Sequence, residues 1–324
     1  MNLKRFTKKL LNRKSILIII GAAIFVAFGG VFIYFREHQN LPEFGMSLMK
    51  SVEDPKAGQK ILVFSPHPDD ETLGAGGYIA TAVKNGAEVK VVFLTNGDGH
   101  WSSSVEEFKE VYLDSADYIQ SGETRQQESK TVLQVLGMKK ENIIFLGYPD
   151  SGLKNLLNQN FNTSYTSPFT KKNSSPYDNS YQKNAVYTGE NLQNNMAKII
   201  SDFGPDIIFV TSSSDIHPDH AAAANFTLRA LKMDSNLHPK LYYYLIHYKR
   251  FPYPKGLHTT RMITPPSKLI NGYNVWFKFM LSQDILNLKE SALKQYKSQL
   301  KVPVLESLMK SFLRQNELFQ EVNY

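Results

Sequence analysis

The chain of 324 residues contains no cysteine. This absence excludes disulfide bonds and thiolate metal ligands, so any metal site must be built from histidine and carboxylate groups. Acidic residues are missing from the start of the chain, where no Asp or Glu precedes residue 15. Six basic residues lie in that tail: Lys4, Arg5, Lys8, Lys9, Arg13 and Lys14.

The rest of the chain lacks an excess of either charge. Of 37 Lys and Arg residues, removing the six in the tail leaves 31, against 30 Asp and Glu residues. The net charge of +7 therefore belongs to the tail, and we expect no nucleic-acid partner for the body of the protein. A hydrophobic content of 42% is enough for a substantial core.

Residues 15–35 form an uncharged, mostly apolar run. A helix of this length measures roughly 30 Å, which is about the thickness of a membrane's hydrocarbon core. A cleaved signal peptide is the alternative, but such a peptide has a shorter apolar region and a small-residue cleavage site. We therefore predict a retained single-pass anchor in the cell membrane. The positive charges before it place residues 1–14 in the cytoplasm and the rest of the protein outside.

Beyond the anchor, residues 36–58 read as a linker and residues 59–324 as one domain. Apolar strands alternate with helices, which predicts an α/β fold with a mostly parallel sheet. Residues 153–186 are rich in Asn, Ser and Tyr and indicate an insertion or lid loop. The expected strands are 61–64, 89–95, 142–147, 206–211 and 241–248. The expected helices are 73–86, 122–136, 189–203, 217–233, 282–300 and 303–320.

Two clusters of His and Asp residues follow predicted strands. His67, Asp69 and Asp70 come after the strand at 61–64, and His217 and His220 come after the strand at 206–211. Because ligands bind at the carboxyl ends of parallel strands, both clusters can meet at one crevice. A catalytic zinc needs three protein ligands and one open position.

The spacing assigns separate roles within these clusters. His67, Asp70 and His220 form a His/Asp/His ligand set, which leaves Asp69 free to act as a general base. His217 lies one helical turn before His220 and can contact a substrate carbonyl, and Asp219 can orient an imidazole. The structural alternative is that the first cluster only caps a helix, since acids favour a helix N-terminus. His38, His238, His247 and His258 are expected to have no role in the site. His100 is expected to be a surface residue, with a place at the rim of the site as the alternative.

These motifs resemble the PIG-L or LmbE-like family of zinc-dependent N-acetylglucosaminyl de-N-acetylases. The resemblance covers roughly residues 60–250. It rests on the blocks at 66–71 and 217–220, with support from 95–97, 146–150 and the helix that carries Arg125. It implies a Rossmann-like three-layer fold preceded by the predicted transmembrane helix.

The resemblance also implies Zn²⁺ on His67, Asp70 and His220, although another divalent metal fits such ligands. It implies that Asp69 is the base and that His217 stabilises the oxyanion. Asp219 is implied as the partner of His217. It makes Arg125 a candidate for contact with the substrate, and Asp150 is a second candidate.

The function implied is removal of the N-acetyl group from an N-acetylglucosamine-containing glycan, glycolipid or conjugate. Two alternatives remain: a zinc amidohydrolase that acts on a non-sugar amide, and a noncatalytic glycan-binding module.

Overall fold

The computed structural model describes residues 20–21, 24–26, 43–110, 112–270 and 275–324. Its seven strands form one sheet: β1 (Lys60–Ser65), β2 (Glu88–Thr95), β3 (Ile143–Tyr148), β4 (Ile207–Thr211), β5 (Lys240–Tyr244), β6 (Val275–Met280) and β7 (Asn316–Val322). The strand order is β3-β2-β1-β4-β5-β7-β6. Strands β1 to β5 pair in parallel, whereas β7 pairs antiparallel with β5 and β6. The predicted α/β fold with a mostly parallel sheet is confirmed.

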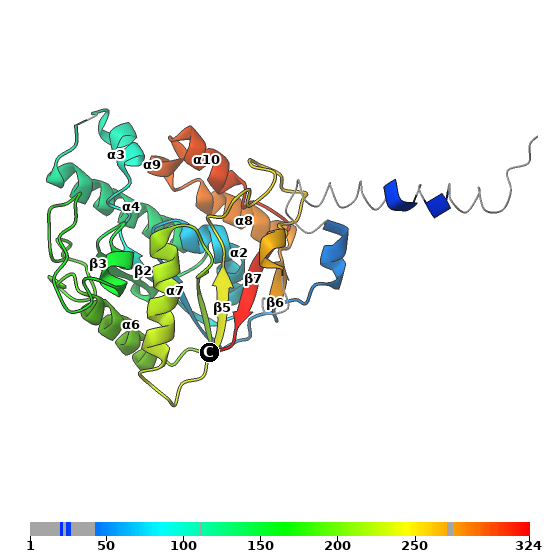
Figure 1. The fold of residues 1–324 in the computed structure, drawn as a ribbon, viewed down its shortest axis with the longest axis horizontal. Helices are drawn as coiled ribbons and strands as arrows, with labels where there is room; N and C mark the ends of the chain where they lie inside the picture. Colours follow the sequence, from blue (N-terminus) through cyan, green and yellow to red (C-terminus); the bar gives the residue numbers. More distant parts are fainter. Residues whose placement is uncertain (1–19, 22–23, 27–42, 111, 271–274) are drawn as a thin grey trace, which may run out of the picture.

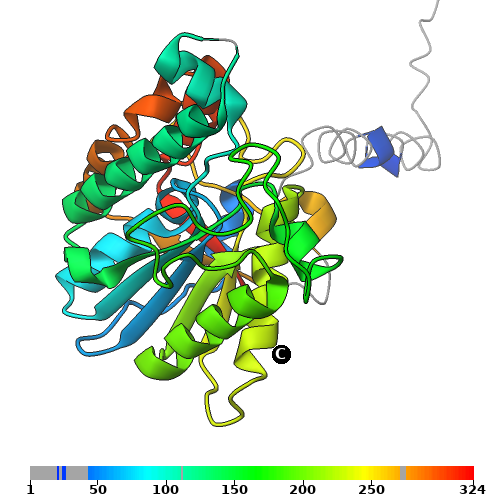
Figure 2. The same ribbon diagram turned by 90° about the vertical axis from the view of Figure 1, so that its left-hand side faces the viewer.

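Helices cover both faces of the sheet and give a three-layer molecule (Figures 1 and 2). The helices are α2 (Asp70–Lys84), α3 (Trp101–Phe108), α4 (Ser115–Val135), α5 (Leu153–Leu157), α6 (Gly189–Phe203), α7 (Pro218–Leu231), α8 (Gln283–Leu293), α9 (Lys297–Leu300) and α10 (Pro303–Lys310). Short 3₁₀ turns are η1 (Glu43–Leu48), η2 (Lys140–Asn142) and η3 (Ser267–Leu269). One buried apolar cluster joins the sheet to α2, α4 and α8, and a second joins it to α5, α6 and α7.

The strand order reverses between β1 and β4. Strand β1 lies next to β4 in the sheet, although their sequences are far apart. The loops that follow these two strands carry the two His/Asp clusters, so the fold brings them to the same edge. This reversal point is where open α/β sheets bind their ligands.

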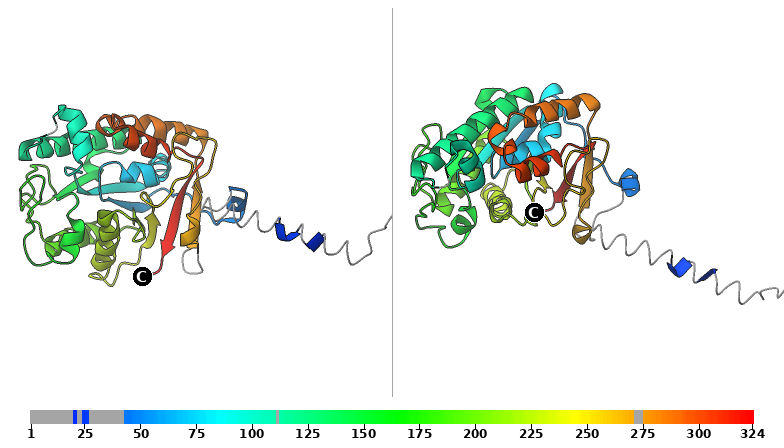
Figure 3. Two further views of the ribbon diagram at one scale, coloured as in Figure 1. Left: turned by 45° about the horizontal axis from the view of Figure 1, so that its top comes forward. Right: turned by 90° about the horizontal axis from the view of Figure 1, so that it is seen from above.

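The prediction of a helix over 303–320 was wrong beyond Lys310. Helix α10 ends there, and Asn316–Val322 form β7, which lies between β5 and β6 (Figure 3, left). Apolar residues at 305, 308, 309, 312 and 313 keep a helical spacing past the end of α10, which explains the error. Strand β6 was also missed, and the helix expected over 282–300 is split into α8 and α9.

Part of the predicted linker packs against the domain. Met46 and Val52 are buried in the core cluster, and the Val52 N–H donates to the Lys278 carbonyl of β6 at 2.9 Å. Most of the predicted anchor, residues 15–35, lies outside the described residues. Among the residues that the structure does describe, no helix is both long and apolar enough to cross a membrane.

The predicted insertion, residues 153–186, begins with α5 and then folds against the edge of the sheet. The Tyr181 N–H donates to the Phe145 carbonyl of β3 at 2.8 Å. Tyr177 and Ala185 are buried. The hydroxyl of Tyr177 donates to Asp98 at 2.7 Å, so this segment also reaches the loop that follows β2.

Candidate metal centre and active site

The loop between β1 and α2 holds Asp69 in an unusual backbone conformation. Its φ is 126° and its ψ is −34°, a region that costs a non-glycine residue about 1–3 kcal/mol. The preceding carbonyl, of Pro68, accepts hydrogen bonds from Arg125 and Gln299, each at 2.8 Å. Glu71 accepts the Asp69 N–H at 3.2 Å. These contacts fix the loop from three sides and maintain its strained turn.

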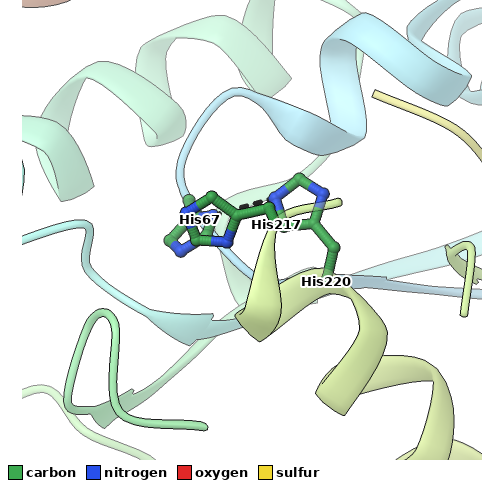
Figure 4. A group of neighbouring side chains, drawn as sticks. All are labelled: His67, His217 and His220. Carbon is green, nitrogen blue, oxygen red and sulfur yellow. Dashed lines mark hydrogen bonds between the residues drawn. The ribbon is translucent and has the colours of Figure 1, made fainter. Parts of the chain in front are cut away.

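Three ligand atoms from the two clusters lie at the corners of a small triangle. The distance from His67 Nδ1 to Asp70 Oδ2 is 3.1 Å, and His220 Nε2 lies 3.1 Å from each of them. Figure 4 shows the imidazoles of His67 and His220 facing one another, one from the β1–α2 loop and one from α7. The predicted ligand set is therefore assembled in the structure.

The size of this triangle fits a metal ion. Ligand atoms at 2.0–2.1 Å from a tetrahedral zinc stand about 3.3–3.4 Å apart. Two imidazole nitrogens and a carboxylate oxygen also match the chemistry of a catalytic site, since they leave a fourth position for water. The donor set fits a divalent metal.

Carboxylates hold the outer nitrogens of both imidazoles. His220 Nδ1 lies 3.1 Å from Asp215, whose carboxylate also accepts the backbone N–H groups of Ile246 and His247 at 3.0 and 2.8 Å. His67 Nε2 lies 3.2 Å from Asp150 and 3.4 Å from Asp219. Such partners fix the proton on the outer nitrogen, so that the inner nitrogen presents its lone pair to a metal.

The charge in this site favours cations. Burial alone lowers the pKa of His220, but Asp70 and Asp215 more than offset it and raise that pKa to about 10. Burial raises the pKa of Asp70, yet His220 and His67 hold it well below its usual range. The carboxylates that favour protons on these imidazoles favour a divalent cation in the same place.

Asp69 lies beside the triangle but does not belong to it. Its Oδ2 accepts a hydrogen bond from the side chain of Gln299 and lies 3.6 Å from a guanidinium nitrogen of Arg125. Burial and the charge of Asp70 raise the pKa of Asp69, an effect that Arg125 opposes in part. A carboxylate with a raised pKa is suited to accept and return a proton.

His217 is the N-cap of α7, and its Nδ1 accepts the backbone N–H of Asp219 at 3.3 Å. Burial and the neighbouring His67 and His220 lower the pKa of His217 to about 3. The ring is therefore neutral near pH 7. Because Nδ1 acts as an acceptor, the proton lies on Nε2, which makes that atom a hydrogen-bond donor.

A cavity of about 140 Å³ joins these groups. Its lining includes the ligands His67 and Asp70, the base candidate Asp69, and His217. This volume is small, so the cavity holds a small group rather than a large ligand.

A family model described as PIG-L: GlcNAc-PI de-N-acetylase matches residues 62–231, slightly more than half of the chain. This chain belongs to that family. A PIG-L relative, the 1D-myo-inositol 2-acetamido-2-deoxy-alpha-D-glucopyranoside deacetylase of Mycobacterium sp. (strain KMS), is 30% identical over 191 residues. That alignment covers 57% of this chain and 54% of the relative. The deacetylase of the same name from Mycolicibacterium smegmatis (strain ATCC 700084 / mc(2)155) is 40% identical over 91 residues. That alignment covers 28% of this chain and 29% of the relative.

The chain thus spans about half the length of the first curated PIG-L relatives that it matches. Solved structures of similar fold include a deacetylase in the biosynthesis pathway of teicoplanin, with a TM-score of 0.52 and 17% identity. That likeness covers 81% of this chain and 97% of the other. A deacetylase of an antimicrobial pseudoaglycone has a TM-score of 0.51 and 18% identity, over 82% and 97% of the two chains. At these identities the likeness shows the fold alone.

Within this PIG-L site, Arg125 and Asp150 line the cavity but are also bound to the protein itself. Arg125 is buried and donates to the carbonyls of Gly97 and Pro68 at 2.7 and 2.8 Å. Asp150 accepts the Gly99 N–H at 3.0 Å and contacts His67. Contact with a substrate stays a prediction for both. The structure gives each a part in holding the site.

The carboxylate of Asp219 lies near His67 and not near His217, its predicted partner. Its carboxylate accepts the N–H groups of Ser151 and Leu153 at 2.7 and 3.0 Å and lies near His67. Only its backbone N–H reaches His217. The side chain therefore ties the loop after β3 to α7 and supports the imidazole of His67 rather than that of His217.

Several residues of the PIG-L site were not foreseen from the sequence. His247 and His100 line the cavity, and the ring centroid of His247 lies 4.9 Å from that of His220. His247 also belongs to a second group with ligand spacing, with Asp70 and His220. Gln299 holds Asp69, and Asp215 holds His220. Asp215 lies two residues before His217, so its strand-end position was a usable signal.

Proposed function

We propose that this protein is a zinc-dependent N-deacetylase that removes the acetyl group from an N-acetylglucosamine-containing glycan, glycolipid or conjugate. The observation that carries the proposal is the triangle of His67 Nδ1, Asp70 Oδ2 and His220 Nε2, with the carboxylate of Asp69 beside it. The names of the curated relatives, deacetylases of an acetamido sugar, support the substrate class.

The ligand triangle would hold the metal, which supplies an activated water and polarises the amide carbonyl when it is bound. Asp69 accepts the proton of the attacking water, and the hydrogen bond from Gln299 keeps its carboxylate in place. The Nε2–H of His217 donates to the carbonyl oxygen as negative charge develops there, an effect worth on the order of 3 kcal/mol. The C–N bond then breaks, Asp69 returns the proton to the nitrogen, and acetate and a free amine leave.

The proposal also places the enzyme at a membrane, with its catalytic domain outside the cytoplasm. Support comes from the uncharged run at 15–35 and the six basic residues before it. A substrate exposed at the cell surface is compatible with that location.

To test the proposal, the protein is freed of metal and reloaded with zinc, and the release of free amine is measured. N-acetylglucosamine, its oligomers and N-acetylglucosaminyl conjugates serve as substrates, with parallel reactions in iron, cobalt and manganese. We expect amine and acetate in equal amounts, from the zinc-loaded protein. A non-sugar N-acetyl amide in the same panel tests the first alternative. If the protein binds the sugars but releases no amine with any of the metals, the result would support the second alternative, a noncatalytic glycan-binding module.

A further inference from the structure

A second hollow adjoins the catalytic cavity. It has a volume of about 480 Å³, within the range of pockets that hold small organic ligands. Its walls come from the residue before His217 (Ile216), from the segment after β5 (Tyr248 and Phe251) and from α10 (Val304 and Leu308). We call this hollow the apolar groove.

The apolar groove and the catalytic cavity share three wall residues: Ile246, His247 and Leu308. The two hollows are therefore adjacent. The catalytic cavity takes about 140 Å³, so any substrate larger than a simple acetamido sugar must extend beyond it. The adjacent apolar groove can receive such an extension.

The rim of the apolar groove exposes large aliphatic side chains to water. Val304 is 78% exposed and Ile216 is 66% exposed. Exposed apolar residues gathered at a hollow are typical of a ligand or interaction site rather than of ordinary surface. Lys255 also lines the groove, but its ammonium donates to the carbonyl of Phe251 at 2.7 Å. The charge is thus directed to the protein's own backbone.

Most of this lining lies beyond residue 231, outside the segment that matches the family model; Ile216 is the exception. The groove is therefore built largely by residues that the family model does not cover. It offers a means of selecting a substrate that the shared catalytic residues do not provide.

We propose that the apolar groove binds an apolar aglycone, a hydrocarbon chain or aromatic group attached to the N-acetylated sugar whose amide lies in the catalytic cavity. The proposal rests on the proposed deacetylase function and narrows its substrate to an amphiphilic glycoside. The three wall residues that the two hollows share favour part of the substrate over a separate partner.

The test compares methyl, butyl and octyl N-acetylglucosaminides with the full chain in lipid nanodiscs, below the concentration at which the octyl glycoside forms micelles. Burial of the longer chain should raise kcat/KM by roughly 10- to 100-fold from methyl to octyl. Val304→Asp should lower the octyl value by about tenfold and leave the methyl value within about twofold. Because residue 304 lies in the first turn of α10, an acid there is compatible with the helix.

Val186→Asp is the matched control, since Val186 is an exposed valine outside both hollows and should alter neither substrate's rate. Equal rates for methyl and octyl glycosides would overturn the groove proposal while leaving the deacetylase function intact. Absence of amine from every glycoside would instead overturn the proposed function, and the groove proposal with it. A preference for N-octanoyl over N-acetyl glucosamine would assign the groove to the acyl chain and contradict the aglycone assignment.

Discussion

Asp69 and Asp70 are neighbours in sequence with opposite environments. Two imidazoles hold the pKa of Asp70 well below its usual range, whereas burial and the charge of Asp70 raise the pKa of Asp69. Adjacent carboxyls whose pKa values are driven apart in this way are suited to different roles. One suits a permanent ligand and the other suits proton transfer.

Asp69→Asn should therefore separate catalysis from metal binding. The amide keeps the shape of the side chain but cannot accept the water's proton, so we expect kcat to fall by about 10²–10⁴-fold. The metal content, measured by elemental analysis, should stay at that of the unchanged protein. Asp202→Asn, which alters only an exposed pair with Lys198, is the control. Loss of the metal from the Asp69 variant would mean that Asp69 is itself a ligand.

Asp98 gives the folded protein a pH dependence of its own. Burial and the charge of Asp150 raise its pKa to about 7, whereas an unfolded Asp titrates near 3.9. Between these values the folded state binds more protons than the unfolded state. The free energy of unfolding should therefore fall as the pH rises from about 4 to 7, by on the order of 3–4 kcal/mol.

Asp98→Asn should remove this slope. The amide has no charge to bury and can still accept the N–H of Asp150. Denaturant unfolding of both proteins at pH 5 and pH 8, in the same metal-loaded state, measures the difference. A variant whose stability falls with pH as steeply as that of the parent would rule out Asp98 as the source.

At the scale of elements, helix α2 is bound to the C-terminal part of the chain by a buried ion pair. Lys289 of α8 and Glu317 of β7 lie 2.6 Å apart with both side chains fully buried. Lys289 donates to the Leu73 carbonyl at 2.9 Å, and Glu317 accepts the Gly77 N–H at 2.6 Å. In a regular helix these two backbone groups would bond to each other, so the pair is built into the hydrogen-bond ladder of α2.

Lys289→Met should destabilise the fold by roughly 3–5 kcal/mol, because it leaves the carboxylate of Glu317 buried without its cation. Adding Glu317→Gln should recover part of that loss. Lys294→Met is the matched control: its partly exposed pair with Glu290 should contribute at most about 1 kcal/mol. Thermal and denaturant unfolding measure all three. A loss under 1 kcal/mol for Lys289→Met would show that the pair contributes little.

On the scale of the whole molecule, the N-terminal anchor is the part of the proposal that fractionation can test. We expect the full chain to remain in the membrane pellet after washing with high salt and alkaline carbonate, and a chain without residues 15–35 to leave it. In sealed right-side-out vesicles, added protease should digest the catalytic domain. If the catalytic domain is protected in those vesicles and digested in inside-out vesicles, the proposed orientation is wrong.

The sequence indicated the ligand triangle because its residues follow two strands that end at the same edge of the sheet. His67 and Asp70 follow the end of β1 directly, and His220 lies in the first turn of the helix that follows β4. His247 was missed because the strand expected over 241–248 included it, whereas β5 ends at Tyr244. Gln299 follows a helix and not a strand. His247 reaches the site because β5 lies next to β4, and Gln299 comes from a short helix whose position depends on tertiary packing. Strands β6 and β7 were hidden for a similar reason, since their partners are set by the complete sheet.

The hydrogen bond from Gln299 to Asp69 also has a consequence for the synthesis of the chain. Pro68 and Asp69 are made early, but the side chain that bonds to both is made 230 residues later. At about 5–20 residues per second, this interval lasts roughly 10–50 s. A nascent chain that has reached residue 231 already carries all three ligands and the base, without the amide that steadies the base. Full activity should therefore begin only when translation has passed α9.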